Sequence, residues 1–411
     1  MQFSKTNYRV FSIILFGFLL FGLKEFAELL YHPLQSTIAF IGLLFIFVSP
    51  FYFRYKRVNL LKGKIRIVFN AYLWWTFLII IRPFFLGQDY SEDSLHPYKI
   101  YGLTSYLLPF IVLLGTSIIS LPKLFNIIFV FSFIGYIFFV LNFSAMQAVV
   151  FSGVTWNTDG EIGLAMLANQ YYYWFSISSL SLLCYEFVPR KYRWVAIFSS
   201  LFMMFLMTYF ARRSGIFMFA LYFLGMFYLY LEQSKSKNRI VKFVFIFALI
   251  SIVFILVQNN SNSIFSILLN RINEDTRSGV DMELIKNLTA ENAWLFGKGI
   301  EGTYKSSFFD EPRYTHESGW LYFILKGGII YLVFYVYLLL HAAYIGFFKT
   351  RNRFTKALAL FMFFHVVFLI PYGLPSFGLE YFFVWISFAI CESSNWRLIT
   401  NEQVKFYFTK T

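Results

Sequence analysis

Apolar runs of about 20 residues recur from one end of this chain to the other, with short polar connections between them. A helix of that length crosses the hydrocarbon core of a bilayer. The strands of a membrane β-barrel would instead alternate apolar and polar residues over segments of about 10 positions. Since these runs are apolar on every face, the pattern predicts an all-α integral membrane protein.

We expect about twelve transmembrane helices from the length and spacing of the apolar runs. Their approximate limits are 10–31, 34–53, 67–86, 100–120, 124–143, 163–187, 195–211, 214–231, 243–258, 318–348, 357–372 and 378–391. The first run continues into Lys24 and Glu25 and has no small-residue cleavage site, which favours a retained span over a signal peptide.

The composition supports the same class of protein. Hydrophobic residues make up 59% of the 411 positions and charged residues only 14%, whereas about a quarter of a soluble domain is charged. Cys184 and Cys391 both fall in expected spans, which favours packing over a disulfide or a metal site. Asp89, Glu92 and Asp93 could hold a hard cation, but a solvated acidic loop is the commoner explanation, so we expect no metal.

The positive charge indicates how the chain is oriented. The net charge of +14 is concentrated in connections on one side of the expected membrane, among them RYKRVNLLKGKIR, PRKYR, KSKNRIVK and KTRNRFTK. The positive-inside rule places that side, and with it both termini, in the cytoplasm. The basic excess then reports topology and contact with anionic lipid, and we expect no nucleic-acid partner.

One long polar stretch, residues 258–317, falls on the outer side. Within it Val280, Leu284, Ile285 and Leu288 have near-helical spacing and predict an amphipathic helix. We therefore expect a single polytopic membrane domain, residues 1–411, that carries one external loop. The segment GKGIEG (297–302) matches the spacing of a dinucleotide motif, but no strand precedes it, so we interpret its glycines as turn residues.

Cations near the outer membrane surface are candidates for binding an anion. Arg212 and Arg213 occupy a turn between two apolar runs, and Arg82 precedes a proline near the outer end of its span. Each could also be a snorkelling anchor. Arg271 and Arg277 lie among acids in the external stretch, where a solvated, salt-bridged face is the simpler explanation.

His316 and Glu317 stand just before the tenth expected span, and Lys326 lies inside it. A lysine at that depth must face protein or water rather than lipid. Together these residues suggest a polar cavity that opens outward, which Glu380 could join. Arginines around such a cavity suit a diphosphate, since their planar fork binds phosphate oxygens bidentately. A neighbouring His or Glu could take a proton from a hydroxyl.

Four short segments follow one another along the chain: ARRSG between two spans, NRINEDTRSG, WLFGKGIEG, and THESGWLYFILKGGIIYLVFY. This order resembles the bacterial O-antigen polymerase and O-antigen ligase superfamily. Members typically show an arginine in a turn, an arginine-bearing loop, a Gly-x-Gly element and a His-Asn pair before a span with a glycine-rich bend. The resemblance covers about residues 195–345. It implies a polytopic glycosyltransferase of the C-type fold that needs no cofactor.

The resemblance also assigns residues to roles. Arg212 or Arg213 matches the turn arginine, while Arg271 and Arg277 match the loop arginines, in the order RSG rather than the family's SGR. With Arg82 and Lys326 they form the expected diphosphate-binding set. His316 matches the proposed catalytic base. Glu317 replaces the usual Asn, which leaves open whether His316 or Glu317 acts.

By this resemblance we expect a surface-polysaccharide polymerase in the bacterial inner membrane. It would join undecaprenyl-diphosphate-linked repeat units on the outer face, with membrane lipid and a chain-length regulator or flippase as partners. A ligase that transfers the glycan to lipid A-core is the close alternative. A transporter or flippase is the alternative from another class, although the chain shows no matching halves and its charges cluster outward.

Overall fold

A computed structural model describes residues 5–30, 32–52, 61, 63–87, 89–91, 102–114, 121–144, 146–147, 164–210, 212–233, 277–307, 312–372 and 376–409. Within these ranges the chain is helical and has no β-strand, only one isolated bridge between Tyr304 and Arg313. The expected span at 243–258 and the first part of the external stretch, with Arg271, lie outside the described residues.

The helices follow the chain in this order: α1 (Lys5–Leu30), α2 (His32–Tyr52), α3 (Lys64–Phe85), α5 (Leu103–Leu107), the 3-10 helix η1 (Leu108–Leu114), α6 (Leu121–Leu141), α8 (Leu164–Phe175), α9 (Ser178–Leu183), the 3-10 helix η3 (Arg190–Tyr192), α10 (Arg193–Tyr209), α11 (Arg213–Gln233), α14 (Arg277–Ala290), α15 (Gly319–Phe348), α16 (Arg353–Phe368), α17 (Leu379–Glu392), α18 (Ser394–Leu398) and α19 (Asn401–Thr409).

The all-α class is confirmed. Four helical segments of the described chain are long and apolar enough to cross a membrane: Lys64–Phe85, Lys123–Leu141, Ser214–Glu232 and Gly319–Phe348. They are compatible with a multi-pass membrane protein. Shorter apolar helices accompany them at Leu34–Ser49, Leu103–Leu113 and Arg193–Tyr209.

Two expected spans differ in the structure. The run at 163–187 is broken, because α8 ends at Phe175 and α9 begins at Ser178. At the break the Ser179 hydroxyl donates to the backbone oxygen of Ser176 at 2.6 Å, a local bond that competes with the helical pattern. In the described part of the run at 100–120, residues 102–114, the helices are α5 and η1, with Pro109 near their junction. Proline has no amide to continue a helical ladder.

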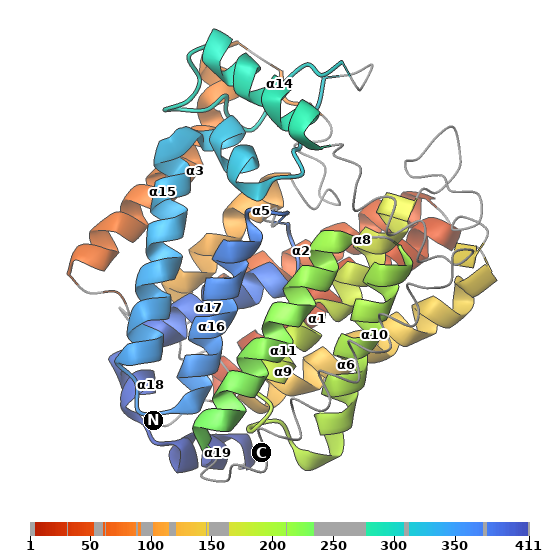
Figure 1. Ribbon diagram of the computed structural model, residues 1–411, viewed down its shortest axis with the longest axis vertical. Helices are drawn as coiled ribbons and strands as arrows, with labels where there is room; N and C mark the ends of the chain where they lie inside the picture. Colours follow the sequence, from red (N-terminus) through yellow and green to blue (C-terminus); the bar gives the residue numbers. More distant parts are fainter. Residues whose placement is uncertain are drawn as a thin grey trace.

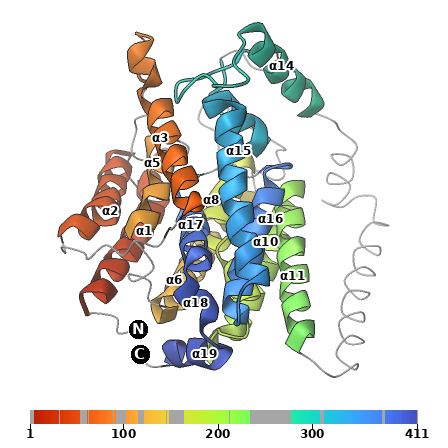
Figure 2. The same cartoon turned by 90° about the vertical axis from the view of Figure 1, so that its left-hand side faces the viewer.

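The long helices α10, α11, α15 and α16 run lengthwise through the molecule, and α14 lies across one end, beyond the beginning of α15 (Figures 1 and 2). We call this the lobe end. The start of α1 and the whole of α19 lie at the opposite end (Figure 2). The end of α3 and the beginnings of α11 and α15 therefore share the lobe end.

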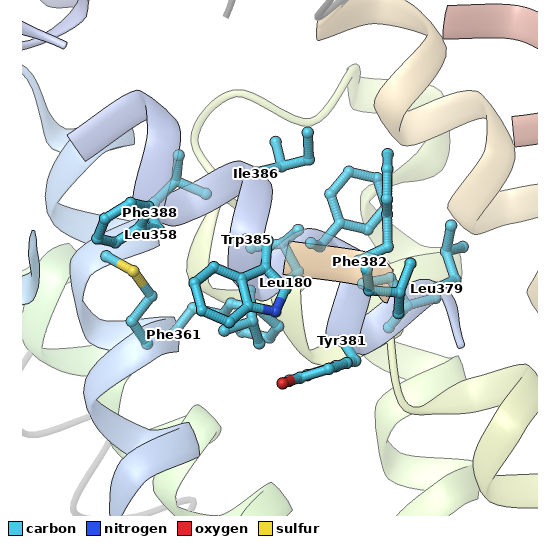
Figure 3. Packing of buried hydrophobic residues seen from close by; sticks show 14 of the residues in the cluster. Leu180, Leu358, Phe361, Leu379, Tyr381, Phe382, Trp385, Ile386 and Phe388 are labelled. Carbon is cyan, nitrogen blue, oxygen red and sulfur yellow. The ribbon is translucent and has the colours of Figure 1, made fainter. Parts of the chain in front are cut away.

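Helix α17 lies in the middle of the bundle. Every residue from Leu379 to Cys391 is buried, as expected for a helix that is apolar on all sides. Trp385 packs against Tyr72 of α3 with ring centroids 5.4 Å apart. Figure 3 shows the side chains of α17 beside Leu180 of α9 and Leu358 and Phe361 of α16. Both cysteines are buried and neither forms a disulfide. Cys391 lies in α17 and Cys184 lies just after α9.

The amphipathic helix expected in the external stretch is confirmed as α14. Leu284 and Leu288 are fully buried and form a small apolar cluster with Leu321, Ile324 and Leu325 in the first turns of α15. This cluster attaches the lobe to α15 and sets the position of the residues between α14 and α15.

Candidate functional site

The site begins with a break inside α15. Gly328 has φ 74° and ψ −179° there, so the helical backbone is interrupted between its first turns and its long inner part. Such an interruption leaves buried amides and carbonyls without their helical partners, and inside an apolar bundle each would be costly.

The segment 294–300 supplies the missing partners. Its amides donate to the freed carbonyls of α15, Lys298 N to Leu325 O at 2.7 Å and Gly299 N to Lys326 O at 2.9 Å. In return the Ile329 amide donates to Trp294 O at 2.8 Å. From α3, the Trp75 indole donates to Gly327 O at 2.8 Å. The lobe is thus hydrogen-bonded into the break.

Glycine is required where these two segments cross. Gly297 has φ 66°, and a Cβ there would stand 2.6 Å from the amides of Gly327 and Gly328. A Cβ on Gly328 would stand 2.0 Å from Leu295 O. Real Cβ atoms do not approach backbone this closely, and positive φ disfavours other residues. The interpretation of the GKGIEG glycines as turn residues is confirmed for Gly297 and for Gly299, which has φ 84°.

Two of the expected anion-binding cations hold the same segment. The Lys326 ammonium is buried and donates to Ile300 O at 2.7 Å and to Gly302 O at 2.8 Å. The Arg82 guanidinium donates to Phe296 O at 3.0 Å and also to Gly297 O. Lys326 therefore faces protein, as its depth in the span required, and its ammonium caps loop carbonyls.

His316 lies just outside α15 and is 1% exposed. Its Nδ1 accepts a hydrogen bond from the Ser318 amide at 3.1 Å, so the ring proton sits on Nε2. Nε2 lies 3.2 Å from a carboxylate oxygen of Asp281, on α14. Burial lowers the pKa of His316, and the Asp281 carboxylate opposes that shift. The imidazole is consequently neutral near pH 7, and its Nε2 lies beside the Asp281 carboxylate without completing a hydrogen bond to it.

Further contacts fix this pair in place. The Ser318 hydroxyl donates to both oxygens of Asp281, at 3.2 and 3.3 Å. The Tyr304 ring packs against the imidazole with centroids 5.5 Å apart. Burial raises the pKa of Tyr304 to about 12, with Arg313 acting in the opposite direction. Tyr304 is therefore a neutral hydroxyl at physiological pH.

Sequence reasoning missed Asp281. It precedes Leu284 and Leu288 by three and seven positions, a spacing that puts it on the apolar face of α14. An acid on the buried face of an amphipathic helix was the available signal. The Asp281 side chain is 30% exposed, so the carboxylate is the part of the pair that solvent reaches.

A cavity of about 590 Å³ lies between the end of α14, the 296–305 segment and the end of α3, and neither His316 nor Asp281 lines it. Arg82, Lys298 and Lys305 line it together with Glu291, Glu301 and Tyr304. Lys298 is held by an ion pair with Glu291 at 2.7 Å and by bonds to Asn287 and to Thr303 O. Tyr304 belongs both to the cavity wall and to the surroundings of His316.

The structure describes the other residues expected in the site only in part. Glu317 is half-buried next to His316. Arg212 immediately precedes α11, and its amide donates to Met207 O at 2.7 Å. The beginning of α11 lies at the lobe end in both views (Figures 1 and 2). The side chains of Arg213 and Arg277, like the whole of Arg271, lie outside the described residues.

Chemically, the site offers the neutral imidazole of His316 next to the Asp281 carboxylate, and a second, half-buried carboxyl at Glu317. Cationic side chains line a cavity at the same end of the helix bundle. Among the residues that the structure describes, no group of three His, Cys, Asp or Glu side chains could hold a metal ion. The chain matches no protein-family model, and no curated protein or solved structure is significantly similar to it.

Proposed function

We propose that the protein is a membrane glycosyltransferase that polymerises surface polysaccharide from undecaprenyl-diphosphate-linked repeat units. The observation that carries the proposal is that Nε2 of the neutral His316 ring lies 3.2 Å from a carboxylate oxygen of Asp281, just before the beginning of α15. An oriented imidazole–carboxylate pair is suited to accepting a proton from a hydroxyl. Arg82 and Lys298 line the adjacent cavity.

In the proposed reaction, an acceptor sugar hydroxyl attacks the anomeric carbon of the donor glycan. The C–O bond to the lipid diphosphate breaks, and the diphosphate leaves with the bonding electron pair. The hydroxyl proton passes to the Asp281–His316 pair or to Glu317. Asp281 is the more exposed member of the pair, so we assign both the first contact with the hydroxyl and the uptake of its proton to the Asp281 carboxylate. His316 and Ser318 hold that carboxylate in position.

Cations at the lobe end would stabilise the departing diphosphate. Guanidinium groups do this well because they stay charged and can bind two phosphate oxygens at once. We assign this role to Arg82 in the cavity and to Arg212, Arg213, Arg277 and Arg271, which the resemblance points to. Lys326 contributes to diphosphate binding indirectly, because its ammonium holds the carbonyls of Ile300 and Gly302 in place. Gly302 is part of the cavity wall.

The proposal includes the topology. About twelve spans would place both termini in the cytoplasm of a bacterial inner membrane and the lobe on the outer face. The Glu186–Arg353 and Glu186–Lys405 ion pairs, at 2.9 and 2.7 Å, involve the beginning of α16 and helix α19, which lies at the opposite end from the lobe. Basic residues are expected at the cytoplasmic end.

The test is the length of surface glycan on a gel in a deletion strain, complemented with wild type, Asp281→Asn, His316→Ala or Glu317→Ala at matched expression. We expect single repeats in the deletion strain, long chains with wild type, and short chains with the Asp281 and His316 variants. Glu402→Gln, on α19 far from the lobe, is the control and should restore long chains. Unattached lipid-linked polymer in the deletion strain would indicate a ligase instead. Full activity in all three site variants would refute the site.

A further inference from the structure

A second ionisable site lies inside the bundle, outside the cavity that Arg82 and Lys298 line. Glu380 stands in the first turn of α17, the helix that is buried on all sides, and its side chain is only 9% exposed. Among the described residues no lysine or arginine forms an ion pair with it. An isolated carboxylate is expensive in such surroundings, and an intramembrane ionisable residue commonly marks a functional site.

The groups around Glu380 are neutral hydroxyls. Tyr172 of α8 donates to its carboxyl oxygen at 3.2 Å, and the Ser176 hydroxyl at the break between α8 and α9 also bonds to it. Tyr222 of α11 and Tyr335 of α15 lie within electrostatic range of the carboxyl. The Ser176 hydroxyl, at the break between α8 and α9, thus lies against the Glu380 carboxyl.

Several polar atoms near this carboxyl have unused bonding capacity. In the described part of the structure, the Tyr222 and Tyr335 hydroxyls are buried and complete no hydrogen bond, although Ser179 and Tyr381 lie close to them. His365 of α16 stacks on Tyr381 at 6.1 Å, and neither of its buried ring nitrogens has a partner there. Each unsatisfied buried group costs free energy, so the two tyrosine hydroxyls favour an occupant that bonds to them.

A series of polar side chains leads from Glu380 toward the surface. Tyr372, which follows α16 and also lies within electrostatic range of Tyr172, donates to the exposed Asn169 of α8 at 3.5 Å. Polar groups thus continue from Glu380 through Tyr172 to Tyr372 and Asn169. An ion could exchange with solvent along this line without crossing the apolar core.

We propose that Glu380, with Tyr172, Ser176 and the buried hydroxyls of Tyr222 and Tyr335, forms an intramembrane site for one exchangeable monovalent cation, a proton or a sodium ion. The single carboxyl supplies the charge, and the hydroxyl oxygens supply neutral ligands. Hard oxygen ligands suit a small inorganic cation. The site does not depend on the glycosyltransferase proposal, because it uses none of the lobe residues.

The experiment is carboxyl labelling of the purified wild-type protein with dicyclohexylcarbodiimide, read by peptide mass spectrometry. A protonated carboxyl adds across a C=N bond of this apolar reagent, and an acyl shift to nitrogen gives a stable adduct with no leaving group. The labelled fraction of Glu380 is measured from about pH 5 to about pH 9 and normalised to the reagent remaining. A sodium series uses choline to hold the ionic strength constant.

We expect Glu380 to be labelled at low pH and the labelling to fall at least tenfold as pH rises. Suppression by sodium at fixed pH would identify sodium as an occupant, and a response to pH alone would identify the proton. Glu392, at the other end of α17 and paired with His341 at 2.8 Å, is the internal control and should label weakly throughout. Tyr172→Phe removes a donor to the charged form and should raise the midpoint pH.

Labelling of Glu380 that stays constant across this range would mean a permanently protonated, structural carboxyl and would overturn the proposal. No labelling at any pH would overturn it as well, because the carboxyl would then be closed to exchange. Glu380→Gln, which should lose the adduct, checks that the signal comes from this residue.

Discussion

Gly297 and Gly328 cross so closely that a Cβ on Gly297 would stand 2.6 Å from the Gly328 amide nitrogen. One glycine belongs to the lobe and the other to the break in α15. The two segments exchange three backbone hydrogen bonds next to this crossing. The lobe and α15 are therefore joined rigidly at this crossing, and a change that disturbs the crossing should also disturb the His316–Asp281 site.

Gly328→Ala should destabilise the protein because it adds both strain and a collision. Positive φ costs a non-glycine residue about 1–3 kcal/mol, and the new Cβ would stand 2.0 Å from Leu295 O. The measurement is the apparent melting temperature in detergent. Gly63→Ala is the matched control, since Gly63 has φ 62° but nothing within 4 Å of the added carbon. Equal melting temperatures for the two variants would contradict the proposed crossing.

Lys326→Met should also lower the melting temperature. It removes the ammonium that donates to Ile300 O and Gly302 O and leaves these carbonyls without their charged donor. Each buried carbonyl left unsatisfied costs about 1–3 kcal/mol. Lys305→Met, a change of the same size at an exposed position of the cavity rim, should be nearly neutral in stability. A Lys326 variant as stable as the Lys305 variant would show that water replaces the ammonium.

Asp281→Asn should reduce transferase activity by about 10²- to 10⁴-fold, the usual contribution of a general base. The amide cannot take up the proton of the acceptor hydroxyl. The control is Glu283→Gln on the same helix, because Glu283 accepts from the Ser307 amide at 3.1 Å and stands apart from the imidazole. The readout is glycan length together with in vitro transfer. Comparable loss in both variants would point to general damage to α14.

Stability should depend on pH through His316. Burial holds its folded-state pKa below the unfolded value of 6.5, so the unfolded chain binds the extra proton first as pH falls. The contribution of this residue is therefore complete above about pH 6.5 and is lost progressively below it, down to the folded-state pKa. The apparent melting temperature of wild type is measured against pH and compared with His316→Gln. A His316→Gln profile with an unchanged acid slope would assign the effect to other groups.

The local pattern of residues predicted much of what the structure contains. Runs that are apolar on every face became helices, because a buried backbone must satisfy its own hydrogen bonds. The spacing of Leu284 and Leu288 predicted the buried face of α14, and the glycines at 297 and 299 predicted a turn. Each of these features depends on neighbours within one or two helical turns, and such information is present in the sequence itself.

The tertiary structure decided the rest. It paired His316 with Asp281, two residues 35 positions apart, and it placed Lys326 against carbonyls of the lobe rather than in an open cavity. It also broke the run at 163–187 so that Ser176 and Tyr172 meet Glu380 of the buried helix α17. These contacts join segments far apart in the chain, and they exist only because helix packing brings those segments together.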